Sequence, residues 1–558
     1  MKMSFPLLIS TVILSISCTV PVACATGEKS EAGAIETLLS GTFKPAAPGA
    51  AVIVTRNGQA LFRKGYGMAD LELQVPIEPE MVFRLGSVTK QFTAVAILML
   101  EEQGKLSVSD PITKFLPDYP TQGQTITVEH LLTHTSGIRS YTEMPEWLPQ
   151  WRKDFTLSEL IDFFKNQPMD FAPDERWLYD NSGYILLGAI IEKVSGQTYE
   201  DFIRTKIFEP LGMKHSYYDH TERIIPKRVK GYERSSSGFQ NAAYLSMTQP
   251  YAAGSLASSV DDLALWDSAL WSNKLLKPES LAKAHKAHVL KTGRVTGYGY
   301  GWAIGTYEGH RTVEHGGGIN GFATYALSLP DDRVFVAILT NGSAGPDASP
   351  ESLAVQMAGI AIGKPVVKPV GISMKAEQLD RYTGVYAIND KEQRFITREG
   401  AQLYSQRSGG TRYAIQPLSE TEFFFPGSLS RLAFTPDSSG KIVRVELRPR
   451  VGPVEEAVRT DKPLPARKEV QVDSTTLQKY AGVYELAPNF LLTVTLEDGK
   501  LMTQATGQSK VQVFPESETK FFLKVTDAQV EFIKDDAGNV TSLKLYQGGQ
   551  IVPARKVK

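Results

Sequence analysis

The feature that most constrains this chain of 558 residues is an internal repeat in its last third. Residues 382–386 (YTGVY) recur as residues 480–484 (YAGVY), 98 positions further on. The same separation relates the pairs Pro417 and Pro515, Ser419 and Ser517, Phe423 and Phe521, Phe434 and Phe532, Asp437 and Asp535, and Gly440 and Gly538. A repeat held in register predicts two copies of one domain, here residues 372–459 and 471–558. Short strand patterns separated by turns favour a small antiparallel β-barrel for each copy.

The part before the repeat, residues 31–363, shows mixed helix and strand patterns. Residues 50–66 and 321–341 are each typical of a β-hairpin, with turn residues between two strand-like runs. Residues 91–100 (QFTAVAILML) are apolar nearly all round, which indicates a helix buried on every side. We therefore expect an α/β (α+β) fold, in which one antiparallel sheet is flanked by helices, followed by the two barrels.

The first 25 residues have the pattern of a signal peptide. Lys2 supplies the positive start, residues 6–16 are largely apolar, and Ala23–Ala25 (ACA) forms a small-x-small cleavage site. The sequence thus predicts export to the periplasm or the medium. The alternative is a retained lipid anchor on Cys18 or Cys24. Both cysteines of the chain lie in this segment, so the mature protein is expected to have no disulfide and no thiol nucleophile.

The charge balance argues against two classes of partner. Lysine and arginine total 60 against 61 acidic residues, a formal net charge of −1. This balance disfavours binding to nucleic acid and to an anionic membrane surface. No stretch after the signal reaches the roughly 20 apolar residues of a membrane-spanning helix, so we expect no integral membrane segment after cleavage.

The pattern Ser87-x-x-Lys90 begins the expected buried helix. A serine there has a free backbone N–H and the positive end of the helix dipole, and a lysine one turn later lies on the same face. Burial lowers the pKa of a lysine, which then serves as the base that serine needs. The same pattern occurs at Ser280–Lys283, in a polar segment, and at Ser517–Lys520. The latter has Glu422 in place of the lysine in the other repeat copy.

Two further motifs carry candidate chemistry. Tyr179 and Asn181 stand just before a second apolar helix, where both can face a cleft. Taken alone, this motif favours a core tyrosine and a helix-capping asparagine over a catalytic pair. His315 leads a run of three glycines into a strand. The G-x-G-x-x-G that begins at Gly316 is not a dinucleotide site, because that motif follows a strand and opens a helix. These glycines instead allow a substrate to approach the backbone.

With these motifs the chain resembles the serine β-lactamase/penicillin-binding-protein superfamily, in the branch of class C β-lactamases, D-aminopeptidases and related esterases. The resemblance covers about residues 35–345 and includes residues 131–137 (LLTHTSG) and 210–213 (PLGM). It rests on three motifs in the family's order: Ser87-x-x-Lys90, Tyr179-x-Asn181 and His315-x-Gly317. It implies the β-lactamase/transpeptidase-like fold, and the tandem barrels resemble the D-aminopeptidase architecture.

The resemblance implies a role for each motif residue. Ser87 is the expected nucleophile and Lys90 the base that accepts its proton. Tyr179 is expected to pass the proton to the leaving group and to activate the deacylating water. Asn181 is expected to hydrogen-bond the substrate and Lys90, and His315 to support Tyr179 and the substrate edge.

The glycines after His315 complete the expected site. The N–H groups of Ser87 and Gly318 are expected to bind the oxyanion, with Gly317 beside them. Class C β-lactamases usually have lysine where this chain has His315, and a lysine charge suits a substrate carboxylate. This difference favours substrates without that carboxylate. We expect the barrels to restrict access to the site rather than to build it.

The sequence therefore predicts an exported serine acyl hydrolase that acts on D-amino-acid peptides or amides, or on esters. A β-lactamase or DD-carboxypeptidase is the alternative enzyme, and a cell-wall or glycan-binding protein with an idle site is the alternative of another class. We expect no cofactor and no metal. His130 and His134 have the spacing of a metal pair, but no zincin-type acidic residue accompanies them. The expected partner is a small peptide, amide or ester, and the sequence leaves the oligomeric state open.

Overall fold

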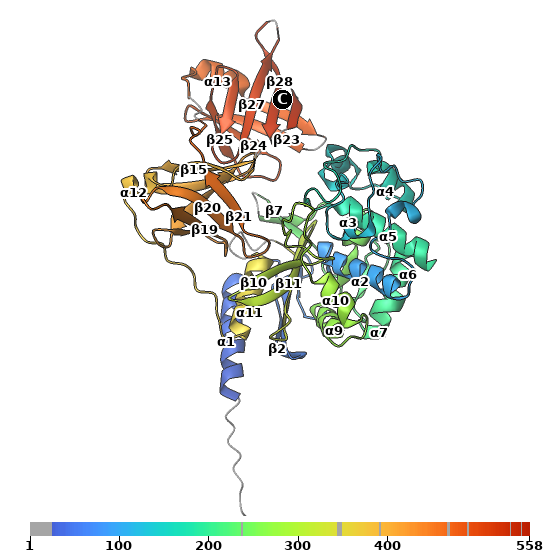
Figure 1. Ribbon diagram of the computed structural model, residues 1–558. Coiled ribbons are helices and arrows are strands. Elements are labelled where there is room, and N and C mark those ends of the chain that lie inside the picture. The colour runs from blue at the N-terminus through green and yellow to red at the C-terminus, as the bar shows by residue number, and fades with distance from the viewer. Residues whose placement is uncertain are drawn as a thin grey trace, which may run out of the picture.

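The computed structural model describes residues 25–235, 238–342, 349–389, 392–465, 469–487, 490–535, 537–547 and 550–558. Except for Ala25, the first residue of helix α1 (Ala25–Thr42), the expected signal peptide lies outside these residues. Figure 1 shows a sheet flanked by helices, followed by two barrels. Within the described ranges, none of the helices has both the length and the apolarity needed to cross a bilayer.

The first part is built on a six-stranded antiparallel sheet that joins the two ends of this region. In sheet order the strands are β10 (Ala303–Tyr307), β11 (His310–Ile319), β12 (Phe322–Leu329), β13 (Val334–Thr340), β1 (Ala50–Arg56) and β2 (Gln59–Tyr66). The two expected hairpins are thus neighbours, since β13 pairs with β1. At the first hairpin turn Asn57 and Gly58 both have positive φ, as a tight turn of this kind requires.

Both faces of the sheet are buried, which explains why its central strands are apolar throughout. Along β1, Ala50, Val52 and Val54 pack with α1 and with α11 (Pro350–Ala361). The alternating residues Ala51 and Ile53 pack on the opposite face against the helical region. Because successive side chains of a strand point to opposite faces, a sheet covered on both sides needs apolar residues at every position.

The helical region lies on one side of the sheet (Figure 1). Its helices are α2 (Thr89–Glu102), α3 (Val128–Leu132), α4 (Leu157–Phe164), α5 (Asn181–Ser195), α6 (Tyr199–Ile203), α7 (Glu209–Leu211), α8 (Tyr251–Gly254), α9 (Val260–Trp271) and α10 (Pro278–Ala284). The first ten residues of α2 are buried without exception, as the sequence predicts. Its start is thereby fixed relative to the sheet.

Each repeat copy forms a closed eight-stranded barrel, which confirms the predicted fold class. The first runs from β14 (Gly384–Ala387) to β21 (Glu455–Arg459) and the second from β22 (Gly482–Ala487) to β29 (Gln550–Lys556). The repeated tyrosines make the same hydrogen bonds in both barrels. The Tyr382 and Tyr480 hydroxyls donate to the carbonyl oxygens of Glu420 and Glu518, respectively. The Tyr386 and Tyr484 hydroxyls donate to the carbonyl oxygens of Tyr382 and Tyr480, respectively. These buried hydrogen bonds explain why the repeat retains its tyrosines.

Candidate active site

The start of α2 lies directly against strand β11. Gly86 has a φ of 54°, and a β-carbon added to it would come within 3.0 Å of the backbone nitrogen of Gly318. A β-carbon on Gly317 would lie only 1.9 Å from the carbonyl oxygen of Leu85. Two glycines therefore let the backbones touch, and this contact fixes the position of Ser87, which lies in the short 3-10 helix η1 (Gly86–Val88) just before α2. An added β-carbon on Gly318 itself meets nothing within 4 Å, so this residue faces open space.

Lys90 lies one turn after Ser87 and is fully buried. Its Nζ lies 3.3 Å from the Ser87 Oγ, 2.8 Å from the Asn181 Oδ1 and 3.0 Å from the carbonyl oxygen of Ala253. Burial lowers the pKa of Lys90 to about 7, partly opposed by the nearby Asp180 carboxylate. Near neutral pH a large fraction of Lys90 is therefore an uncharged amine.

The three partners of Lys90 differ in what they can exchange. The Ala253 carbonyl oxygen and the Asn181 Oδ1 only accept hydrogen bonds, because the Asn181 amide nitrogen donates to Thr142 at 2.9 Å. Only the Ser87 hydroxyl can donate. When Lys90 is neutral, its two N–H bonds satisfy these two acceptors, which leaves its lone pair for the Ser87 proton. This arrangement makes Lys90 a base for Ser87.

The Tyr179–Asn181 segment is held at the start of α5. Asp180 is the N-cap: its Oδ2 accepts a hydrogen bond from the Gly183 N–H at 3.0 Å. The residues on either side of the cap then face the site, with Asn181 bonded to Lys90. Here the capping role considered from the sequence belongs to Asp180, which leaves the Asn181 side chain available to the site.

The Tyr179 ring covers Lys90, whose Nζ lies 4.7 Å from the ring centroid. Burial raises the pKa of the Tyr179 phenol well above its ordinary value, so the phenol stays protonated near neutral pH. The Tyr179 phenol oxygen makes no hydrogen bond of normal geometry to a described residue. The nearby Ser87 hydroxyl nevertheless partly offsets the increase in the pKa of Tyr179. The phenol is thus a buried proton donor close to the serine.

His315 is buried, and both of its ring nitrogens are engaged. Nδ1 lies 2.6 Å from the carbonyl oxygen of Gly316 and therefore carries the proton, while Nε2 accepts from the Tyr298 hydroxyl at 2.7 Å. Burial and the nearby Lys90 charge lower the pKa of His315 to about 3. His315 is therefore neutral. It hydrogen-bonds Tyr298 rather than Tyr179, whose ring centroid lies 6.2 Å away.

The comparison with known proteins shows the family. The family model described as "Beta-lactamase" matches residues 34–358, more than half of the chain. The chain belongs to this family. It is accordingly a serine hydrolase of the β-lactamase family, as the motifs predict, and a second model, a domain of unknown function (DUF3471), matches residues 466–555.

Relatives in the β-lactamase family include both sequences and structures. Penicillin-binding protein 4* of Bacillus subtilis (strain 168) is 31% identical over 440 residues, which cover 73% of this chain and 94% of that protein. The octameric penicillin-binding protein homologue from Pyrococcus abyssi is 27% identical with a TM-score of 0.55, covering 76% of this chain and 99% of that one. D-amino acid amidase from Ochrobactrum anthropi SV3 shares the fold at 23% identity, with a TM-score of 0.53 and coverage of 60% and 99%.

Three residues near this β-lactamase-family site were not found by sequence reasoning as parts of it. His134 lies between two tyrosines, with its ring centroid 4.3 Å from that of Tyr179 and 4.7 Å from that of Tyr298, and its Nδ1 accepts from the Asp180 N–H at 3.1 Å. Burial raises the pKa of Asp180 to about 7. The alternation of aromatic residues and glycine at residues 298–302 (YGYGW) is a signal that could have identified Tyr298.

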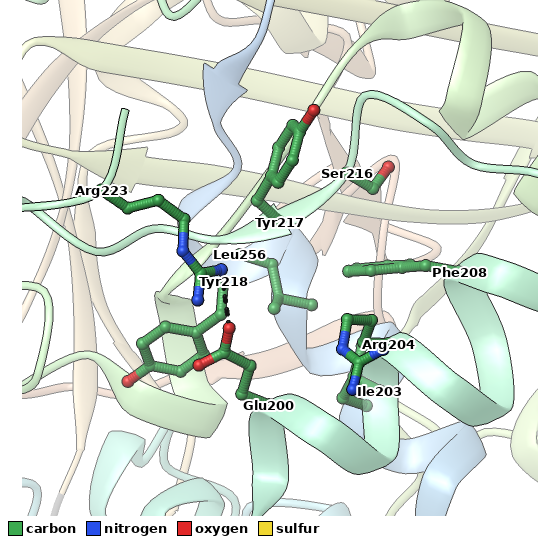
Figure 2. A pocket seen from close by; sticks show the side chains of 9 residues that line it. All are labelled: Glu200, Ile203, Arg204, Phe208, Ser216, Tyr217, Tyr218, Arg223 and Leu256. Carbon is green, nitrogen blue, oxygen red and sulfur yellow. Dashed lines mark hydrogen bonds and ion pairs between the residues drawn. The ribbon is translucent and has the colours of Figure 1, made fainter. Parts of the chain in front are cut away.

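The remaining candidates have structural roles or lie elsewhere. His130 accepts from the Thr127 N–H in a capping box and forms no metal pair with His134. Among the described residues no group of three or more His, Cys, Asp or Glu is placed to hold a metal ion. A cavity of about 30 Å³ lies beside Tyr218 and the Glu200–Arg223 ion pair (Figure 2). It has room for one or two water molecules and is lined by none of the predicted site residues.

Proposed function

We propose that the protein is an exported hydrolase that cleaves peptides or amides of D-amino acids, or small esters, through an acyl-enzyme on Ser87. The observation that carries this proposal is the set of three partners around the Lys90 amine, of which only Ser87 can give up a proton. A serine beside a neutral buried amine is an activated nucleophile for carbonyl carbon.

Each step follows from the positions of these groups. The Ser87 Oγ bonds to the carbonyl carbon as its proton moves to Lys90, and the oxyanion that forms is bound by the N–H groups of Ser87 and Gly318. Tyr179 gives its proton to the leaving nitrogen or oxygen and regains one from Lys90, as the bond to the leaving group breaks. Water then bonds to the acyl carbon and gives a proton to the same pair. The pair returns this proton to the Ser87 Oγ as the ester bond breaks, which releases the acid and restores the free serine.

The substrate class follows from the third motif. A neutral His315 with both nitrogens engaged offers no positive charge to a substrate carboxylate. This supports substrates without a carboxylate next to the scissile bond, and the resemblance to the D-aminopeptidase branch supports D-amino-acid amides among them. A β-lactamase or DD-carboxypeptidase is the second candidate, favoured by the 31% identity to a penicillin-binding protein.

A panel of substrates tests the proposal. D-alanine p-nitroanilide, its L enantiomer, p-nitrophenyl acetate and nitrocefin are assayed with the wild type and with Ser87→Ala. We expect turnover of the D-anilide or the ester in excess of nitrocefin, and none by the variant. Faster turnover of nitrocefin would instead support the β-lactamase. No turnover and no labelling of Ser87 by a fluorophosphonate would support the binding protein with an idle site.

Export is the second part of the proposal and has its own test. Its support is the positive, apolar and small-x-small pattern of residues 1–25. Mass spectrometry of protein recovered from the periplasm or medium is expected to show Thr26 as the first residue. A chain that begins at Met1, or a lipid on Cys18 or Cys24, would contradict cleavage at this site.

A further inference from the structure

A short turn of the first barrel contacts the catalytic sheet. The turn, residues 450–452, connects β20 (Ile442–Arg448) to β21 and is called the docking turn here. Val451 forms an antiparallel bridge with Gly305 of β10, the edge strand of the sheet. The Thr306 N–H donates to the carbonyl oxygen of Arg450 at 3.5 Å. The barrel thus covers an exposed sheet edge with its own backbone.

Arg450 extends from this turn behind the catalytic strand. Its guanidinium is nearly buried and donates to Glu314 at 2.7 Å, to the Tyr325 hydroxyl at 3.0 Å and to Glu351 at 2.7 Å. The Glu314 side chain is 0% exposed and also accepts from Thr312 and from Tyr325, both at 2.8 Å. The cation that pairs with this buried carboxylate therefore comes from another domain, and such a charge is costly to leave unpaired.

The docking turn also touches a second segment. Gly297, which has a φ of 74°, lies so close to Gly452 that a β-carbon added to Gly297 would come within 2.2 Å of the Gly452 Cα. Position 297 therefore has no space for a side chain beside the docking turn. The Gly297 carbonyl oxygen accepts from the Ile304 N–H at 2.9 Å, so this contact belongs to the same sheet edge.

The docking turn contacts Glu314 and Gly297, each of which is next in the chain to one partner of the hydrogen bond between Tyr298 and His315. Glu314 precedes His315, and Gly297 precedes Tyr298, whose hydroxyl donates to the His315 Nε2 at 2.7 Å. We propose that the docking turn is a positioning element of the active site, which holds Tyr298 and His315 in register through Gly297 and Glu314. This inference rests on the proposed function, and it differs from the expectation that the barrels only restrict access.

The turn is specific to the first barrel. In the second barrel the last pair of β28 (Val540–Gln547) and β29 is Gln547 and Gln550, so only two residues separate the paired positions in the sequence. In the first barrel the last pair is Leu447 and Glu455, which leaves a longer turn with Arg450 in it. The repeat thus provides an internal example of the barrel without the docking arginine.

Full-length variants test this inference by two readouts, turnover and the rate at which a fluorophosphonate labels Ser87. Arg450→Ala is expected to lower both by about tenfold or more. The matched control is Arg448→Ala, an exposed arginine two residues earlier that pairs with Glu446, and it is expected to stay within about twofold of wild type. Equal rates for Arg450→Ala and wild type would overturn the inference.

A double variant separates positioning from stability. Arg450→Ala leaves the Glu314 charge buried and unpaired, so the variant can lose activity by unfolding. Arg450→Met with Glu314→Gln removes both charges, and circular dichroism is expected to show a folded protein. Its labelling rate is expected to stay about fivefold or more below wild type. Full recovery of the rate would show that the ion pair serves stability alone and would overturn the inference.

A mutant cycle with Tyr298→Phe identifies the route of the effect. If the docking turn acts through the Tyr298–His315 bond, the charge-free double variant adds little further loss in a Tyr298→Phe background. Additive losses would overturn the proposed route. A different result would refute the proposed function, namely a wild-type protein whose Ser87 is not labelled. A wild type that is labelled, with variants that react at the same rate, would refute only the positioning role of the docking turn.

Discussion

The chain contains the pattern Ser-x-x-Lys at Ser87–Lys90 and again at Ser517–Lys520, and the two places differ in every physical respect. Lys90 is fully buried, and its Nζ lies 3.3 Å from the Ser87 Oγ. Ser517 is exposed, and its hydroxyl accepts the backbone N–H of Lys520 at 3.1 Å. The same four-residue pattern is thus a base and nucleophile in one region and a turn in the other.

The difference shows which part of the environment makes the chemistry. Lys520 pairs with Glu516 at 3.9 Å near the surface, where water solvates its charge. Lys90 has lost that solvation, and two of its three partners are carbonyl oxygens that cannot take its proton or give it one. Burial lowers the pKa of Lys90 to about 7, and geometry directs its lone pair to serine. The pattern alone carries neither property.

The largest effect expected is that of removing the nucleophile. Ser87→Ala is expected to lower turnover by about 10⁴-fold or more, because no other group forms the acyl-enzyme. Ser517→Ala and Ser280→Ala are the matched controls and are expected to turn over at the wild-type rate. Initial rates on the best substrate of the panel measure all three. Substantial activity in Ser87→Ala would place the nucleophile elsewhere.

The next effect concerns the base. Arginine keeps its charge at any accessible pH, so Lys90→Arg cannot accept the serine proton. Turnover is expected to fall by about 10²–10³-fold. Lys520→Arg, the same change in the exposed pattern, is expected to be neutral. Comparable losses in the two variants would mean that burial does not distinguish the two lysines.

The pH dependence of kcat/KM tests the low pKa that distinguishes the buried Lys90 from the exposed Lys520. Lys90 must be neutral to accept a proton, so kcat/KM is expected to rise with pH through about 7 and then to level off. The Asp180 carboxylate favours the charged form of Lys90, so Asp180→Asn is expected to lower the pKa of Lys90 and to move the rising limb to lower pH by about one pH unit. Asparagine also caps helices, which limits the structural change.

The control for this shift is Asp473→Asn, which changes the N-cap of α13 (Ser474–Tyr480) before the second barrel. Its profile is expected to match the wild type. A limb that stays in place in Asp180→Asn, or that moves to higher pH, would show that the carboxylate does not act on Lys90. Profiles of kcat/KM between pH 5 and pH 9 measure the effect.

The smallest expected effect is on stability. Ser517 accepts a backbone N–H in its turn, and its repeat partner Ser419 accepts the N–H of Glu422 at 3.0 Å. Replacing either serine by alanine is expected to lower the free energy of unfolding of its barrel by about 0.5–1 kcal/mol, with turnover unchanged. Chemical denaturation measures the change, and a loss of activity in Ser517→Ala would give this pattern a function that its turn does not explain.

Local patterns predicted much of this molecule because they depend on near neighbours. The 98-residue repeat, the apolar helix at residues 91–100 and the two hairpins each correspond to an element of the fold. The Tyr298–His315 bond was not predicted, because it joins a loop before β10 to the next strand and depends on their spacing in three dimensions. The role of Arg450 was not predicted either, since nothing near it in sequence indicates the buried Glu314 that it pairs with.

The glycines at the junction of α2 and β11 have a consequence for how this enzyme changes over generations. Gly86 and Gly317 bring helix and strand together by backbone contact, so the width of the catalytic gap is set by atoms that every residue has. A mutation that adds a β-carbon at Gly317 would bring it within 1.9 Å of the Leu85 carbonyl oxygen, so it must push helix and strand apart. Exchanges among core side chains that take no part in this backbone contact act on the width less directly. Such a site tolerates drift in its surroundings while its own dimensions stay constant.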